Sequence, residues 1–444
     1  MEVTRTLARY VVNSRLADIP KPVRAEAVRS VVNWLGCAVG ACQHEAVECA
    51  LQAMAPFQGP KQASILGRRD KTDILNASLM NGITSHVFDF DDTHLPTIIH
   101  PAGPVASSLF ALAEYKPISG AELLHAFILG VEVECRIGNA VCPDHYEVGW
   151  HITGTAGVFG SAAACGKVLG LDEQQLTWAL GIAGTTSSGF REMFGTHCKS
   201  FHPGRAAQNG LLAALLAEKN FTSSNQVLEA KRGFANVMST KQDYSRITEG
   251  LGKTFEVSLN SYKPFACGIV IHPSIDACVQ LKQENKLTGA EVEKIELFVA
   301  PLVLELTGKR TPQVGLEGKF SVFHSCAVAL LDGAAGEKQY SDARVRDPKV
   351  IALREKVEPV IDKKMRDDEA RVRLTLKDGR VLEKHVEHAV GSAEVPMTNA
   401  QLEEKFHVLC DDILGVERTA RLLSLAWSVE ELKDAAEICR AATP

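Results

Sequence analysis

Apolar residues recur at helical spacing from Arg5 to about Leu281, and this pattern constrains the fold more than any other feature of the chain. Proline, glycine and Ser-Gly breaks divide it into separate segments. One typical segment is "PISGAELLHAFILGVEVECRIGNAV", where Ser119 can cap a helix and Glu122 stands at capping-box distance. The pattern predicts a large domain built almost entirely of α-helices.

Beyond Leu287 the sequence changes character. "VEKIELFVAP" alternates like a strand, and "ARVRLTLKDGRVLEKHVEH" predicts a β-hairpin that turns at Asp378-Gly379. Between these segments, "KFSVFHSCAVALLDGA" predicts a buried helix. The tail of the chain has helical spacing again.

These patterns predict the domain organisation. A length of 444 residues is typical of two or three domains. We expect a mainly α fold with an all-helical domain over 1–284, a smaller α+β domain over 285–395, and C-terminal helices over 396–444 that pack back on the helical domain.

Composition limits the partners of the chain. The formal net charge of -6 provides no basic field for nucleic acid or an anionic membrane surface. The opening "MEVTRTLARYVVNSRLADIP" does not resemble a secretory signal, and no apolar run reaches the 18 residues of a membrane span. We therefore expect no nucleic acid and no membrane as partners, and a cytoplasmic location, with the mitochondrial matrix left open.

The segment "SHVFDFDDTHLPTIIHPAG" contains three histidines, two threonines and three aspartates. Its "FDFDDT" matches the D-x-D-x-T loop of dehalogenase-type phosphatases, but that loop must end a buried parallel strand. Here the preceding "DILNASLMNGITSHV" has helical spacing, and the chain contains no Gly-Asp dipeptide to complete a magnesium site. The glycines of "GTAGVFG" likewise have the wrong spacing for a dinucleotide loop.

The same segment offers an alternative metal site. Carboxylates and imidazoles at five positions could bind an ion: Asp89, Asp91, Asp92, His94 and His100. No second metal motif supports this reading, and the twelve cysteines form no C-x-x-C pair. We therefore do not expect a metal at these residues.

Histidines recur where helices are predicted to begin. His100, His202 and His272 each precede a proline and a helical segment, and His151 precedes another helical segment without proline. A helix N-terminus binds anions and favours the neutral form of a nearby imidazole. A single His-Pro pair is ordinarily no more than a helix start, but three in one chain indicate a site.

Cations stand near two of these histidines. Lys199 and Arg205 flank His202, and Lys263 lies nine positions before His272. If these helix ends face one cleft, they predict a binding site for a small molecule with two or three carboxylates.

Five blocks of the sequence together resemble the MmgE/PrpD family. They are "HVFDFDDTHLPTIIHPAG", "HITGTAGVFGSAAACGKVLGL", "CKSFHPGRAAQNGLLAALLA", "YKPFACGIVIHPSIDA" and "KFSVFHSCAVALLDG". The resemblance covers nearly the whole chain in order. It implies a large helical domain built from both chain ends, a smaller α+β lid, a homodimer, and catalysis without metal or organic cofactor.

The resemblance also implies site residues. Carried over from the cis-aconitate decarboxylase pattern, they are Asp89, Thr93, His100, His151, Lys199 and Lys263. Two departures stand out: the interval after Thr93 is one residue longer than in the animal decarboxylase, so His94 or His100 takes the expected place. His324 replaces a tyrosine of that decarboxylase.

The common chemistry of the family makes or breaks a C–H bond next to a carboxylate, which needs cations at the oxygens and a base. We assign Lys199 and Lys263, helped by His202, to carboxylate binding. His100 is the expected base or proton donor and His151 its partner, while Asp89 and Thr93 orient the imidazole or a substrate oxygen.

The chain is therefore expected to be a cofactor-independent lyase that acts on a citrate- or aconitate-like acid, of the 2-methylcitrate dehydratase or cis-aconitate decarboxylase kind. An iminodisuccinate-type epimerase is one alternative. A non-catalytic dimeric scaffold is another, although the intact set of Asp, Thr, His and Lys side chains argues against it.

Overall fold

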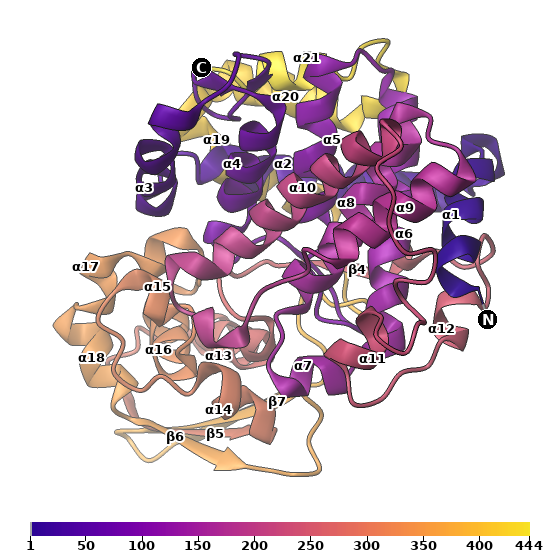
Figure 1. The fold of residues 1–444 in the computed structure, drawn as a ribbon. Coiled ribbons are helices and arrows are strands. Elements are labelled where there is room, and N and C mark those ends of the chain that lie inside the picture. Colours follow the sequence, from indigo (N-terminus) through magenta and orange to yellow (C-terminus); the bar gives the residue numbers. More distant parts are fainter. Residues whose placement is uncertain (1) are drawn as a thin grey trace.

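A computed structural model describes residues 2–444, and the fold is mainly α (Figure 1). Long helices pack side by side in the larger part, with α10 in contact with α4, α5, α8 and α9. These helices are α1 (Val3–Asn13), α2 (Lys21–Gly40), α3 (Glu45–Met54), α4 (Ile74–Val87), α5 (Ala102–Tyr115), α6 (Gly120–Val141), α8 (Ile152–Leu169), α9 (Glu173–Gly184) and α10 (His197–Glu218). The predicted helical pattern is confirmed.

Local chemistry explains where these helices begin and how closely they approach. The capping box expected at α6 is present, because Ser119 and Glu122 each accept a hydrogen bond from the other's backbone N–H. Helices α4 and α10 cross at Gly82 and Gly204. A Cβ on Gly204 would lie 2.4 Å from the main-chain oxygen of Leu79, so only glycine permits this crossing.

A four-stranded sheet forms the centre of the smaller part, drawn in orange in Figure 1. Its strands are β5 (Val292–Val299), β6 (Val357–Ile361), β7 (Ala370–Leu376) and β8 (Val381–Val386), in the order β6-β5-β7-β8. Only β5 and β6 run parallel. Alternate residues of β7 are buried, and the predicted strand and hairpin are confirmed.

Helices α13 (His272–Asn285) and α16 (Val322–Asp332) pack on one another and on this sheet. The predicted buried helix corresponds to α16. Helix α13 lies before the expected domain boundary at 284/285 yet contacts β7 and β8. The boundary itself stays a prediction.

The C-terminal helices return to the helical part. Helix α19 (Asn399–Leu414) packs along α2, α20 (Val416–Trp427) packs on both, and α21 (Ala436–Ala441) contacts α5 and α20. Figure 1 shows this segment in yellow among the indigo and purple helices of the N-terminal half. Among residues 2–444, no helix combines the length and apolar character that a membrane span requires.

Short elements connect these units. They are α7 (Asp144–Val148), α11 (Phe234–Met238), α12 (Ser245–Thr248), α14 (Pro301–Thr307), α15 (Gly315–Gly318), α17 (Asp342–Val345), α18 (Pro348–Arg354), β1 (Ala63–Ser64), β2 (Lys71–Thr72), β3 (Asp92–His94) and β4 (Asn260–Tyr262). The pair β3 and β4 matters most. Its antiparallel register sets Asp92 opposite Tyr262 and Thr93 opposite Ser261, which brings two segments distant in sequence together.

Candidate active site

A cavity between the helical part and the smaller part is lined by Thr307 and by six further polar residues that carry its chemistry. They are Asp89, His100, Tyr146, His151, Lys199 and Lys263. Apolar side chains such as Phe194, Leu306 and Phe320 close the remaining wall. The cavity volume of about 40 Å³ leaves room for about three water molecules. The ionisable groups therefore interact in a nearly dry environment.

Asp89 holds two ammonium groups at once. Its Oδ1 lies 2.7 Å from Nζ of Lys199 and 2.7 Å from Nζ of Lys263. These cations keep the pKa of the Asp89 carboxyl well below its ordinary value, although burial opposes them. The second oxygen, Oδ2, is buried and has no partner among residues 2–444. The two ammonium groups thus share the one carboxylate of Asp89, so each can also bind a carboxylate of a ligand.

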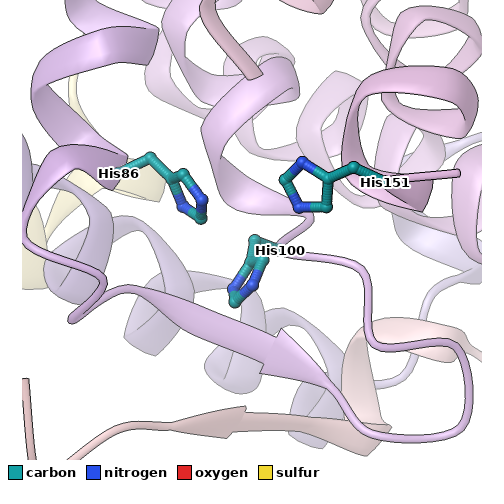
Figure 2. A group of neighbouring side chains, drawn as sticks. All are labelled: His86, His100 and His151. Carbon is teal, nitrogen blue, oxygen red and sulfur yellow. The ribbon is translucent and has the colours of Figure 1, made fainter. Parts of the chain in front are cut away.

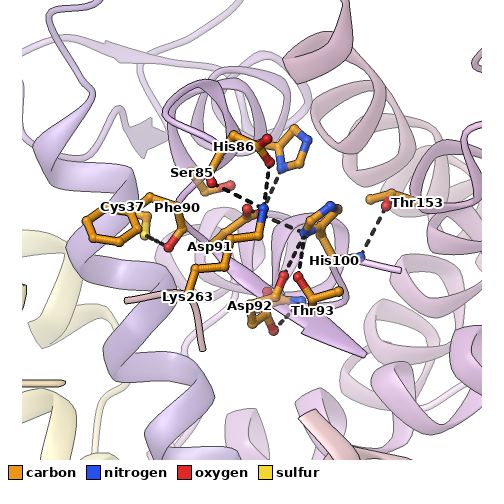
Figure 3. Close-up of polar contacts among 12 residues, drawn as sticks. Cys37, Ser85, His86, Phe90, Asp91, Asp92, Thr93, His100, Thr153 and Lys263 are labelled. Carbon is orange, nitrogen blue, oxygen red and sulfur yellow. Dashed lines mark hydrogen bonds and ion pairs between the residues drawn. The ribbon is translucent and has the colours of Figure 1, made fainter. Parts of the chain in front are cut away.

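His100 precedes α5, as its His-Pro motif predicts. Its polar contacts (Figure 3) show which ring nitrogen carries the proton. Its Nδ1 lies 2.6 Å from the main-chain oxygen of Asp92, which can only accept, so Nδ1 carries the proton and donates. The Thr93 hydroxyl lies 3.3 Å from the same nitrogen. Burial, the largest effect, holds the pKa of His100 well below the ordinary value. The imidazole is neutral, with an unprotonated Nε2.

Two further histidines, His86 and His151, lie beside His100 (Figure 2). His86 Nδ1 lies 2.6 Å from Asp91 Oδ2, and His151 Nδ1 lies 2.8 Å from His202 Nδ1. The His86 ring centroid is 4.7 Å from that of His100, and the His151 centroid is 6.3 Å from it. Burial lowers the pKa of both His86 and His151. Three neutral imidazoles therefore face one another.

Asp92 supports the other side of His100. Its Oδ2 accepts hydrogen bonds from Nδ2 of Asn260 at 2.7 Å and from the backbone N–H of Ala102 at 3.2 Å. Burial raises the pKa of the Asp92 carboxyl to about 7, and the nearby Asp91 carboxylate adds to the shift. The contacts of Asp92 fix the backbone oxygen that orients His100.

One sequence interpretation is wrong. His202 does not stand at a helix N-terminus, because α10 begins five residues earlier at His197, where the Thr196 hydroxyl caps the backbone N–H of Cys198. Pro203 lies inside the helix. His202 still reaches the site through its bond to His151. His272-Pro273 does begin α13, and His151 is the N-cap residue of α8.

Four predicted residues do not line the cavity. Thr93 and His202 contact residues that line it, whereas His94 and His324 have other partners. His94 is engaged at both nitrogens, with Nδ1 2.7 Å from the Thr97 hydroxyl and Nε2 2.9 Å from Glu256 Oε2. His324, on α16, contacts the main-chain oxygen of Gln339 through Nε2 at 2.9 Å and does not line the cavity. The proposed metal set of Asp89, Asp91, Asp92, His94 and His100 is therefore not assembled around one point.

Sequence reasoning missed His86 as a site residue. It belongs to the "SHVFDFDDTH" segment and lies on α4, five residues before Asp91. The His86 side chain is buried, and the loop after α4 brings the Asp91 carboxylate within hydrogen-bond distance of His86 Nδ1. A histidine in a helical segment rich in apolar residues, followed closely by acidic residues, was the available signal.

Comparison with known proteins covers nearly the whole chain. The family model described as the MmgE/PrpD N-terminal domain matches residues 5–247, and that of the MmgE/PrpD C-terminal domain matches residues 265–431. Cis-aconitate decarboxylase of Aspergillus terreus is 27% identical over 97% of this chain and 94% of its own length. The Homo sapiens cis-aconitate decarboxylase is 26% identical, and the match covers 97% of this chain and 92% of that decarboxylase. The 2-methylcitrate dehydratase of Salmonella typhimurium is 24% identical, and the match covers 86% of this chain and 84% of the dehydratase. The chain belongs to the MmgE/PrpD family.

Proposed function

We propose that this protein is a cofactor-independent lyase that transfers a proton at the carbon next to a carboxylate of a citrate- or aconitate-like di- or tricarboxylic acid. One observation carries the proposal. The ammonium groups of Lys199 and Lys263 share Asp89 in the same small cavity as the neutral imidazole of His100. Cations beside a neutral base are what this chemistry requires.

The two lysines bind substrate carboxylates. When a proton leaves the adjacent carbon, negative charge develops on the carboxylate oxygens, and Lys199 and Lys263 stabilise it in a site that excludes water. Asp89 keeps both ammonium groups at the cavity in the absence of substrate. His202 contributes through its contact with His151.

His100 moves the proton. Its Nδ1–H is held by the Asp92 carbonyl oxygen, so the free Nε2 can accept a proton from carbon. In a dehydration, His100 takes this proton from carbon and delivers it to the hydroxyl on the neighbouring carbon, which leaves as water. In a decarboxylation, the bond to one carboxylate breaks, its electrons move onto carbon, and His100 in its protonated form delivers the proton.

Decarboxylation and dehydration are each supported by a different observation. The relatives that match 97% of this chain are cis-aconitate decarboxylases, which favours decarboxylation. The unprotonated Nε2 of His100 in the free protein favours proton abstraction, as in dehydration. An epimerase of the iminodisuccinate kind would use the same base but return the proton to carbon. We place dehydratase and decarboxylase ahead of it, because the relatives found have those activities.

Substrate entry requires movement. A cavity of about 40 Å³ cannot hold a tricarboxylate, so the wall that contains Leu306 and Phe320 must move away from the helical part. We also propose a homodimer in the cytoplasm, as the family resemblance implies. Light scattering in solution tests the dimer.

The activity is tested in deuterated water with cis-aconitate, 2-methylcitrate and iminodisuccinate. Release of carbon dioxide identifies a decarboxylase, an unsaturated acid formed from 2-methylcitrate identifies a dehydratase, and deuterium uptake without net conversion identifies an epimerase. No turnover or binding of any of the three acids would contradict the proposal.

His100→Gln tests the assignment of the base. We expect a fall in kcat of about 100-fold or more, since a positioned acid–base group contributes roughly 10²–10⁴-fold. The matched control is His125→Gln, because His125 is also buried but contacts Ser14 on another side of the helical part. Equal activity of the two variants would remove His100 from the mechanism.

A further inference from the structure

We propose that His86, His100 and His151 form a binding site for a divalent transition-metal ion of the zinc class, and that the bound ion inhibits the enzyme. The three side chains come from the end of α4, the segment before α5 and the N-cap position of α8. Figure 2 shows the three rings turned toward a common space.

Distances support a shared ligand. One nitrogen from each ring lies within 4.8 Å of the other two. Three such points lie within about 2.8 Å of a common centre, whereas a zinc–nitrogen bond measures about 2.0–2.1 Å. Each ring would therefore move inward by about 0.7 Å or less. Small rotations of the side chains supply such movement without a change in the backbone.

Hydrogen bonds already orient the rings as metal ligands. In known sites, a histidine that binds metal through one nitrogen usually donates its other N–H to a carboxylate, a carbonyl or another acceptor. Here each Nδ1 has such a contact: Asp91 Oδ2 for His86, the Asp92 oxygen for His100 and His202 Nδ1 for His151. The Nε2 atoms of His86 and His151 are buried and have no partner within the described chain.

The charged side chains around the three rings are balanced in number. Lys199 and Lys263 repel a metal cation, while the carboxylates of Asp89 and Asp91 attract it, so two positive charges face two negative charges. Asp89, whose Oδ2 has no hydrogen-bond partner within residues 2–444, also offers a carboxylate oxygen to a second group of close ligand atoms with His86 and Asp91. The pKa values of the three imidazoles are lowered, mainly by burial, so the ion does not have to displace protons.

Occupation of this site has a direct consequence for the proposed function, on which the inhibition rests. A metal ion bound to Nε2 of His100 takes the lone pair that would accept the substrate proton. It also fills the space between His100 and His151 where the reacting carbon must lie. Metal binding and proton transfer therefore exclude one another, while binding alone can be tested without any activity.

The binding test uses the full chain with Cys49→Ser and Cys198→Ser, because these two thiols are exposed and could bind metal themselves. Co²⁺ is titrated into the metal-free protein, and d–d absorption in the visible region reports nitrogen ligation in a low-symmetry site. Zn²⁺ is then added to displace Co²⁺, with calorimetry for affinity. We expect one ion per chain and loss of the cobalt spectrum on addition of zinc.

Variants assign the ligands. His86→Gln and His151→Gln should each weaken Zn²⁺ binding by at least tenfold, and Asp91→Asn should weaken it by about 10–100-fold through the orientation of His86. His125→Gln should leave it unchanged. Circular dichroism and thermal melts establish that each variant is folded. Asp91→Asn keeps the test decisive if a histidine variant does not fold.

Three results would overturn the inference. They are the absence of a cobalt spectrum, unchanged affinity in the folded variants, or Zn²⁺ binding that leaves turnover unaffected. The expected result is inhibition by Zn²⁺ that a chelator reverses and that His86→Gln weakens in parallel with binding. If the protein binds Zn²⁺ through these histidines but turns over no polycarboxylate, the metal site stands and the proposed function fails.

Discussion

The ammonium nitrogen of Lys405 lies 2.9 Å from the main-chain oxygen of Lys263, so a C-terminal helix holds a segment of the candidate site. The same Nζ donates to Asn33 Oδ1 at 2.7 Å and to the main-chain oxygen of Phe90 at 2.5 Å. Burial lowers the pKa of Lys405 to about 8. One buried cation thus ties α2, the Asp89 loop and the Lys263 segment together.

Lys405→Met should loosen this arrangement. Three buried acceptors would lose their donor, and we expect the free energy of unfolding to fall by roughly 1–3 kcal/mol. KM for the carboxylic acid should rise more than kcat falls, because Lys263 would lose its fixed position. Urea unfolding and steady-state kinetics measure both effects. Lys433→Met, an exposed change in the same C-terminal segment, is the control. Unchanged KM and stability would show that Lys405 does not position Lys263.

Asp89 has a positive φ angle, and its carboxylate pairs with two buried lysines. Its φ of 50° lies in the left-handed region, which asparagine tolerates and alanine does not. Asp89→Asn therefore removes the charge alone and leaves two adjacent ammonium groups unpaired. We expect the free energy of unfolding to fall by roughly 3–5 kcal/mol. Asp89→Ala should lose about 1–2 kcal/mol more through backbone strain.

Citrate provides a second measurement on the same variants. Its carboxylates can replace the missing charge, so citrate should raise the melting temperature of Asp89→Asn more than that of the unmodified protein. An equal shift in both proteins would argue that Lys199 and Lys263 do not bind carboxylates.

Much of the fold could be predicted because its signals are local. Helical spacing, the Ser119 capping box and the turn at Asp378-Gly379 each depend on residues close in sequence, and the structure contains all three. The His202-Pro203 motif misled because a proline can also lie inside a helix. The capping threonine at 196, six residues before His202, decides where α10 begins.

The site was predictable where one segment carries it. Asp89 and His100 belong to a single stretch of chain, and the cavity contains both. The contact of His94 with Glu256 joins residues 162 positions apart, so the sequence alone left His94 and His100 open, and our proposal of His100 draws on this contact. Lys405 comes from the far end of the chain, and no local pattern distinguishes a buried lysine from an exposed one on a helix.

Gly204→Ala tests the crossing of α4 and α10 that places Lys199. A Cβ at this position would lie 2.4 Å from the main-chain oxygen of Leu79, which cannot rotate away. We expect a loss of roughly 1–3 kcal/mol in the free energy of unfolding, despite the higher helix propensity of alanine. Gly336→Ala is the control, because its Cβ would meet only Gln339 Oε1, at 3.7 Å. Equal melting temperatures for the two variants would contradict the close crossing.

Buried imidazoles should make the protein sensitive to mild acid. The histidines whose pKa values are lowered, mainly by burial, are His44, His86, His100, His125, His145, His151, His202, His272 and His324. For five of them the pKa falls to about 4. Between pH 6.5 and about 4 the unfolded chain therefore binds more protons than the folded chain, and these groups destabilise the fold as pH decreases.

Buried carboxyl groups act in the opposite direction over part of this range. Burial raises the pKa of Asp92 and Glu132 to about 7, and that of Glu134 well above its ordinary value. The folded chain keeps these protons up to higher pH, so acidification toward pH 4.5 stabilises it through them. Raised carboxyl pKa values also occur at Glu337 and Asp367, which makes five such groups against nine imidazoles. The imidazoles should dominate, and the melting temperature should fall steadily from pH 6.5 to 4.5. Calorimetry at constant ionic strength measures it, and a constant or rising melting temperature would mean that the histidines titrate normally in the folded protein.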